Sequence, residues 1–202
     1  MSIITISRQM GSLGCEVAQI VAESLNYRLV WRELINQAAR RAGTPEVALA
    51  DIDELGLLNI TPTPKAKRAY RLAIQQVMQE LADENNVVIV GRAGQIILAD
   101  HPDVLHIRMI APNSLRAERI AKRLSVSLDS AQAQIQVSDH YRANYLHRFY
   151  QVRWDDPALY HLVLNTGRIS PHQAANIICQ AVNQLGQADV SKDRSNQEIC
   201  LD

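Results

Sequence analysis

The chain has 202 residues, 47% of them apolar, and its 21 lysines and arginines balance 21 aspartates and glutamates. This composition excludes disordered, collagen-like and disulfide-scaffold classes, and the length predicts one domain that buries about 70% of the surface its unfolded form would expose. A formal net charge of zero argues against a broad electrostatic surface for duplex nucleic acid or an anionic membrane, so we expect a small-molecule partner.

The three cysteines point to a reducing compartment. Cys15, Cys179 and Cys200 form no Cys-x-x-Cys pair, and an odd number of scattered cysteines argues against a disulfide framework or a zinc knuckle. The sequence contains no run of about 18 apolar residues and no basic amino-terminal region with a cleavage site. We therefore expect a cytoplasmic protein without a transmembrane helix or a signal peptide.

Apolar patterns predict alternating strands and helices along the chain. Short runs rich in β-branched residues indicate buried parallel strands, and apolar positions recurring every three or four residues indicate amphipathic helices. In chain order we expect a strand at 3–7, a helix at 16–25, a strand at 27–31, helices at 32–42 and 65–84, strands at 87–90 and 104–110, helices at 113–124 and 128–150, a strand at 161–164 and a helix at 171–185. Because parallel strands need crossover connections, this order predicts a three-layer α/β sandwich with a central parallel sheet.

Local signals mark several boundaries. The last helix has Ser170 in position to cap its start, Pro171 at its first position and Gly186 just past its end. The Thr-Pro-Thr-Pro sequence at 61–64 is a stiff turn that begins the long helix, and residues 186–202 have the composition of a disordered tail. We therefore expect one folded domain over residues 1–185.

The first predicted strand leads into a glycine-containing loop followed by a helix. The loop contains Arg8, Gly11, Ser12 and Gly14, and the helix begins near Cys15. Loop amides and a helix amino terminus form a concave anion site, and glycines allow the backbone to approach a phosphate closely. The GxxxxGK[ST] motif is absent, because no lysine lies between Arg8 and Arg28. A tight strand-to-helix turn that needs two glycines is an equally good interpretation of this segment alone.

A second candidate is the glycine turn after the strand at 87–90. It carries Arg92 between Gly91 and Ala93. Ligands of open α/β sheets bind outside the carboxyl ends of the strands, and a planar guanidinium suits bidentate recognition of phosphate. The alternative is that Arg92 pairs with a nearby carboxylate such as Asp139, or with a helix end.

Further along, basic and aromatic side chains gather on two helices. Arg116, Arg119 and Arg123 share one face of the helix at 113–124, although such charged faces are often only solvated. Aromatic residues cluster at 141–150, where they could stack on a base or simply pack the helix against the core. The six histidines have no carboxylate or cysteine companions at ligand spacing, so no metal-ligand set is predicted.

The order of these motifs resembles the cytidylate kinase-like family of P-loop nucleotide kinases. The segments that carry the resemblance are ITISRQMGSLG, VVIVGRAGQIIL, HPDVLHIRMIAPNSLRAERIAKR, SDHYRANYLHRFY and DPALYHLVLNTGRIS, and together they extend over about residues 3–183. The resemblance implies a P-loop kinase sheet, ATP with Mg²⁺ as phosphoryl donor, a nucleoside monophosphate or other small molecule as acceptor, an acceptor region in the helices of 32–85 and a basic lid over 116–153. A homo-oligomer is compatible with it, and neither nucleic acid nor membrane is implied as a partner.

Site residues follow from the resemblance position by position. It implies catalytic roles for Arg92, Arg119 and Arg142. It implies nucleotide-binding roles for a second set, and these residues are Arg8, Gly11, Ser12, Gly14, Cys15, Arg123 and Asp139.

The chain departs from a true cytidylate kinase at several of these positions. Gly14 or its neighbour stands where the P-loop lysine belongs, Ala93 stands where an aspartate follows the Gly-Arg pair, and Trp31 stands where relatives carry aspartate. Leu13 replaces a glycine, and residues 43–64 are too short for the extra cytidine-binding subdomain of bacterial enzymes. Three readings therefore stay open: an active kinase, a catalytically degenerate protein that binds nucleotide in a regulatory role, and a purely structural relative. Because the lysine is absent and Leu13, Ala93 and Trp31 depart from the family pattern, we expect nucleotide binding to persist with little or no phosphorylation of CMP.

Overall fold

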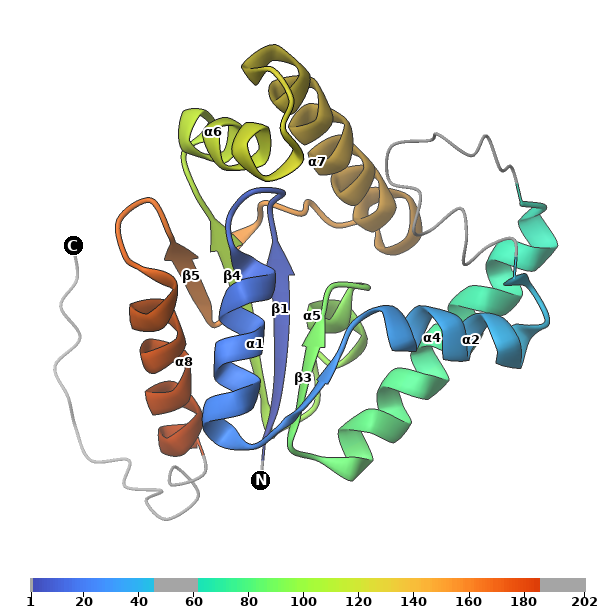
Figure 1. Ribbon diagram of the computed structural model, residues 1–202. Helices are drawn as coiled ribbons and strands as arrows, with labels where there is room; N and C mark the ends of the chain where they lie inside the picture. The colour runs from blue at the N-terminus through green and yellow to red at the C-terminus, as the bar shows by residue number, and fades with distance from the viewer. Residues whose placement is uncertain (1, 46–61, 186–202) are drawn as a thin grey trace, which may run out of the picture.

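The computed structural model describes residues 2–45 and 62–185, and within them five strands form one all-parallel sheet (Figure 1). The order across the sheet is β2-β3-β1-β4-β5. The strands are β1 (Ile3–Arg8), β2 (Arg28–Val30), β3 (Val87–Val90), β4 (Val104–Ile110) and β5 (Leu162–Asn165). All five predicted strands are confirmed, and the second is shorter at both ends than the predicted 27–31.

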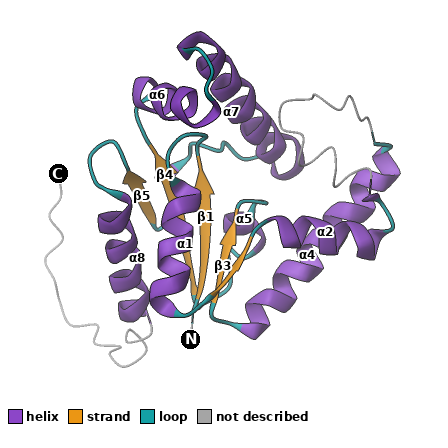
Figure 2. Cartoon of the chain, viewed as in Figure 1, coloured by secondary structure: helices purple, strands orange, loops and turns teal. Residues whose placement is uncertain are grey.

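Helices fill the connections, as Figure 2 shows. They are α1 (Gly14–Leu25), α2 (Arg32–Ala42), α4 (Pro64–Glu84), α5 (Gly94–Ile97), α6 (Asn113–Leu124), α7 (Leu128–Tyr150), the 3₁₀ helix η1 (Pro157–Leu159) and α8 (Pro171–Leu185). The six predicted helices are confirmed. The short α5 and η1 are additions, because a single turn is too short to show a helical period in the sequence.

Two apolar cores separate the layers of the sandwich. On one face, side chains of β1 such as Ile4 and Ile6 pack against α1 and α8. On the other face, Ile3 and Ile89 pack against α2 and α4. Alternate residues of one strand thus enter opposite cores, as the two-residue period of a strand requires. The expected three-layer α/β sandwich is confirmed.

The predicted cap of α8 is also present. The Ser170 hydroxyl accepts from the Gln173 amide at 3.2 Å, and the Gln173 side chain accepts from the Ser170 amide at 2.9 Å. This reciprocal pair is a capping box. At the start of α4, the Thr63 hydroxyl accepts from the Ala66 amide, with Pro64 in the first turn. Gly186, Thr61 and the tail predicted at 186–202 lie outside the described residues.

The sheet topology gathers the candidate loops at one edge. Strand β1 pairs with β3 on one side and with β4 on the other, so the chain winds in opposite directions from the centre of the sheet. Ligands of open parallel sheets bind outside the carboxyl ends of the strands at such a switch point. The paired helices α6 and α7 lie beyond this edge (Figure 1).

Candidate functional site

The loop between β1 and α1 presents the start of a helix to the carboxyl edge of the sheet. Gly11 has φ +80°, and a Cβ there would lie 2.9 Å from the carbonyl oxygen of Arg116, so only glycine fits. Leu13 precedes the helix in a left-handed conformation and supplies no capping oxygen. The amides of Gly14, Cys15 and Glu16 in the first turn have no intrahelical acceptor. The geometry suits an anion at this helix start.

Ser12 is used inside the loop. Its side chain is fully buried, its hydroxyl donates to the Gln9 carbonyl at 2.8 Å, and its amide donates to the same carbonyl at 3.2 Å. Its own carbonyl accepts from the Thr166 hydroxyl at 2.9 Å. We therefore expect Ser12 to fix the shape of the loop, and the predicted nucleotide contact to come from the amides that follow it.

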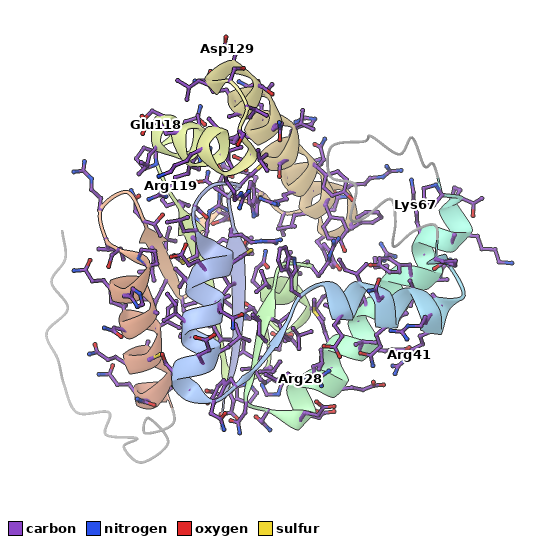
Figure 3. The ribbon with its side chains drawn as sticks, in the orientation of Figure 1. Arg28, Arg41, Lys67, Glu118, Arg119 and Asp129 are labelled. Atoms are coloured by element: carbon purple, nitrogen blue, oxygen red, sulfur yellow. The ribbon has the colours of Figure 1, made fainter. Side chains whose placement is uncertain are left out.

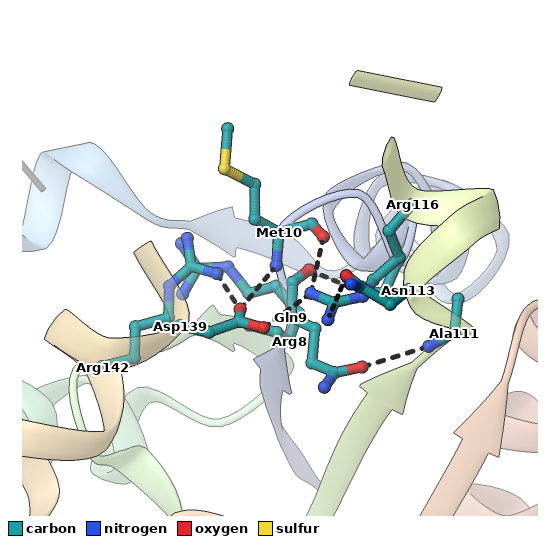
Figure 4. Close-up of polar contacts among 9 residues, drawn as sticks. Arg8, Gln9, Met10, Ala111, Asn113, Arg116, Asp139 and Arg142 are labelled. Carbon is teal, nitrogen blue, oxygen red and sulfur yellow. Dashed lines mark hydrogen bonds and ion pairs between the residues drawn. The ribbon is translucent and has the colours of Figure 1, made fainter. Parts of the chain in front are cut away.

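An ion pair ties this loop to the two helices beyond it (Figure 4). The guanidinium of Arg116 lies 2.6 Å from the Asp139 carboxylate and also donates to the Met10 carbonyl at 3.2 Å. Asp139 in turn accepts from the Met10 amide at 3.3 Å. The side chains of Arg116 and Asp139 are 7% and 20% exposed. Asp139 therefore holds the loop to α6 and α7, and it pairs with Arg116, an arginine that was singled out only as part of a basic face.

The other two arginines of that face differ from each other. Arg119 donates to the Gly11 carbonyl at 3.2 Å and to the Thr166 carbonyl at 2.9 Å, so it joins the loop to the segment after β5 (Figure 3). Arg123, one turn further along α6, is exposed. The predicted face is thus anchored at its first two arginines and open to solvent at the third.

The side chain of Arg8 crosses from the end of β1 toward the end of β3. Its Cβ is so near Gly14 that a Cβ on that glycine would lie 2.5 Å away. Its guanidinium lies against Gly91 and stands over the ring of Trp31, 5.7 Å from the ring centre. Trp31, at a position where the resemblance leads one to expect aspartate, thus lies beside the Arg8 guanidinium.

The turn after β3 is held in an unusual backbone conformation. Gly91, Arg92 and Ala93 all have positive φ angles, of 81°, 55° and 57°. Ala93 is 2% exposed and packs in an apolar cluster with Leu146 and Trp154. A carboxylate at position 93 would be desolvated there, so this environment does not suit the aspartate that the resemblance leads one to expect at this position.

Three predicted arginines meet at one cavity at this edge. Its lining includes Arg8, Arg92 and Arg142, with Tyr141 and Tyr145 from α7 on one side. Arg142 also donates to the carbonyl of Arg8 at 3.1 Å. Arg92 and Arg142, for which the resemblance implies catalytic roles, thus line the same cavity. Two of the aromatic residues at 141–150 therefore face the cavity, and Leu146, which follows Tyr145, lines it as well while it packs in the apolar cluster with Trp154.

Sequence reasoning missed the buried polar layer beneath this cavity. Arg108 on β4 is 6% exposed, donates to the Trp154 carbonyl and lies 4.6 Å from the centre of the Trp154 ring. Trp154 Nε1 donates to the Ser7 hydroxyl at 2.9 Å, and burial raises the pKa of Tyr160 beside them. An arginine inside the apolar run of β4 was the available signal, because a buried guanidinium needs several acceptors.

The described residues offer neither a metal-ligand cluster nor a membrane-spanning helix. Within 2–45 and 62–185, no three His, Cys, Asp or Glu side chains are grouped to hold a metal ion. Position 15, where a P-loop has the Ser or Thr that contacts Mg²⁺, is a cysteine, a poor ligand for that ion. Across the described part of the chain, no helix has the length and apolar character needed to span a bilayer.

Comparison with known proteins shows which family the chain belongs to. A family model described as the cytidylate kinase-like family matches residues 3–168. A cytidylate kinase of Pyrococcus horikoshii is 29% identical over 201 residues, which cover 98% of this chain and 96% of that protein.

Solved structures share the fold. An uncharacterized protein from Eubacterium ventriosum superimposes with a TM-score of 0.70 at 22% identity, over 91% of this chain and 99% of that one. A gluconokinase from Sinorhizobium meliloti gives a TM-score of 0.59 at 14% identity, over 93% and 94% of the two chains. At such identities the likeness concerns the fold alone.

Proposed function

Because the chain belongs to the cytidylate kinase-like family, we propose that it is a nucleotide kinase that transfers the terminal phosphoryl group of ATP to a nucleoside monophosphate or another small acceptor. The observation that carries the proposal is the cavity where Arg8, Arg92 and Arg142 meet beside the start of α1. Phosphoryl transfer depends on positioning and on stabilising charge, and helix-terminal amides with arginines provide both.

The two sides of the cavity suggest two half-sites. On one side, the amides at the start of α1 would hold phosphates of the donor, with Arg119 keeping the loop in shape through Gly11. On the other side, Arg92 would hold the phosphate of the acceptor, with Tyr141 and Tyr145 as flat surfaces for its base. Mg²⁺ would arrive as the companion of the ATP phosphates, since such ions are commonly bound through phosphates and water.

The alternative of a protein that binds nucleotide without turnover has no support in the comparisons, because relatives matched over nearly the whole chain are cytidylate kinases. The absence of the P-loop lysine does not argue against turnover, since three arginines line the cavity.

A coupled assay of ADP release tests the proposal. The purified chain would be given Mg²⁺-ATP with CMP, dCMP, UMP, AMP or GMP in turn, and with no acceptor. We expect at least one acceptor to be phosphorylated at a rate of roughly 1–100 s⁻¹. Arg92→Ala should lower that turnover by about 10²-fold or more, because a charged donor to phosphate is lost.

Arg28→Ala is the matched control. Arg28 is exposed and lies near the amino-terminal end of the sheet (Figure 3), where it pairs with Glu33 and Glu84. It should leave turnover unchanged. ATP binding without turnover on any acceptor would contradict the proposal and establish the degenerate reading.

A further inference from the structure

Two positions of the loop have exchanged their usual residue types. In the P-loop motif GxxxxGK[ST], a glycine and the lysine stand six residues apart. Here Arg8 and Gly14 stand six residues apart in the same strand-loop-helix context. The cationic residue, Arg8, is at the end of β1, and Gly14, which has no side chain, is at the start of α1.

The structure shows why the two positions depend on each other. A Cβ on Gly14 would lie 2.5 Å from Cβ and 3.2 Å from Cγ of Arg8, and 3.1 Å from Cβ of Met109. Real Cβ atoms do not approach backbone-fixed neighbours so closely. The space above β1 therefore holds a side chain from position 8 or from position 14, but not from both.

A second glycine makes room for the far end of the Arg8 side chain. Gly91 has φ +81°, and a Cβ there would collide with Nη1 of Arg8. On its other side, the guanidinium stands over Trp31. These contacts direct Arg8 into the cavity that it lines together with Arg92. The guanidinium thus lies between the helix start, where the donor phosphates would bind, and the proposed acceptor residue.

We propose that Arg8 supplies, from the end of β1, the positive charge that a lysine at the start of the helix supplies in other P-loop proteins. Its ligand is the terminal phosphate region of a nucleoside triphosphate, so the inference rests on the proposed function for the identity of the donor. A guanidinium also offers a planar pair of donors to phosphate oxygens, which an ammonium lacks.

An exchange of the two residues tests this. The variants are Arg8→Gly, Arg8→Gly with Gly14→Lys, and Arg8→Gly with Gly14→Met, which has a long side chain without charge. Arg28→Ala is the control for loss of an exposed arginine. For each chain, thermal unfolding checks folding, calorimetry gives the Kd of ATP and of AMP, and the ADP-release assay gives turnover.

We expect Arg8→Gly to weaken ATP binding by about 10- to 100-fold, the range for a lost hydrogen bond to a charged group, while AMP binding changes less. Adding Gly14→Lys should recover most of the lost ATP affinity, and adding Gly14→Met should not. Unchanged ATP affinity in Arg8→Gly would overturn the inference, as would equal recovery by lysine and methionine.

The test of the role of Arg8 and the test of the proposed kinase activity can fail independently. If the wild-type chain binds ATP but phosphorylates none of the acceptors, the proposed kinase activity fails, and the ATP affinities of the three variants still decide the role of Arg8. If the wild-type chain does not bind ATP, both are overturned.

Discussion

Residues with left-handed backbone conformations mark both turns of the site. Leu13, Arg92 and Ala93 are not glycines, yet their φ angles are 59°, 55° and 57°. Each such residue costs on the order of 1 kcal/mol or more, and the conformation persists only where the surroundings fix it. Here the cluster around Ala93 and the first turn of α1 do so. The strain lies at the edge where the arginines meet.

A buried histidine on β4, His106, stacks on the exposed His161. His106 is 4% exposed, its ring nitrogen Nδ1 lies 2.7 Å from the Thr5 hydroxyl, and its ring stacks on His161 with centres 5.0 Å apart. Burial, with the His161 charge as a second cause, lowers the pKa of His106 to about 4. In the unfolded chain the pKa is near its ordinary value of about 6.5.

We therefore predict that stability falls as the pH drops from about 6.5 to about 4. In this window the unfolded chain binds a proton at His106 and the folded chain does not, so acid favours unfolding by an amount on the order of 2–3 kcal/mol. Above about pH 6.5 both states are neutral at His106, and this contribution is absent. The free energy of unfolding, measured in urea at several pH values, should show this decline.

His106→Gln should flatten the decline of the free energy of unfolding with falling pH, because a glutamine side chain does not titrate. The exposed His172→Gln is the matched control and should keep the wild-type slope. Equal slopes for wild type and His106→Gln would show that carboxylates alone cause the acid sensitivity.

At the scale of elements, an ion pair between the helices α6 and α7 also holds the loop after β1. Arg116 comes from α6, Asp139 from α7, and both contact the backbone of Met10. The ion pair is mostly buried, so removal of one partner leaves a poorly solvated charge.

We predict that Arg116→Met and Asp139→Asn each lower the free energy of unfolding by about 3 kcal/mol. The double variant should lose less free energy of unfolding than the two single variants lose together, by at least about 1 kcal/mol, because the second change removes a group that the first has already left without its partner. Urea unfolding of the four chains measures this coupling.

Arg28→Met is the control and should change the free energy of unfolding little, since exposed ion pairs contribute little to stability. Strict additivity of Arg116→Met and Asp139→Asn would show that the two side chains do not act as a pair. The same variants should weaken ATP binding, because the loop loses its support.

The sequence predicted the long elements because their periods repeat over several turns or alternations. It did not predict α5 or η1, which are single turns. Ser12 and Arg116 were judged by residue type and spacing, and their hydrogen bonds involve segments more than a hundred residues away, such as Thr166 and Met10. Arg92 and Arg142 were assigned catalytic roles through the resemblance alone, since no local pattern relates positions 50 residues apart.

At the scale of the whole molecule, the switch point between β1 and β3 places the two proposed half-sites side by side. The donor half depends on α1 and on the loop that Arg119 supports. The acceptor half depends on the turn after β3 and on α7, which supply Arg92 and Tyr145. Because the halves come from different elements, a change in one need not remove binding in the other.

We predict that the two ligands stabilise the fold separately. At about 100 times its Kd, a non-hydrolysable ATP analogue or the accepted nucleoside monophosphate should each add about 2.7 kcal/mol to the free energy of unfolding, seen as a rise in Tm. Arg92→Ala should keep the shift caused by the analogue and lose most of the shift caused by the monophosphate, whereas Arg28→Ala should keep both.

Loss of both shifts in Arg92→Ala would mean that Arg92 supports the donor phosphates as well, and retention of both would remove it from the acceptor half. Either result would contradict a division of the cavity at the β1–β3 boundary, because that division assigns the guanidinium of Arg92 to one ligand only.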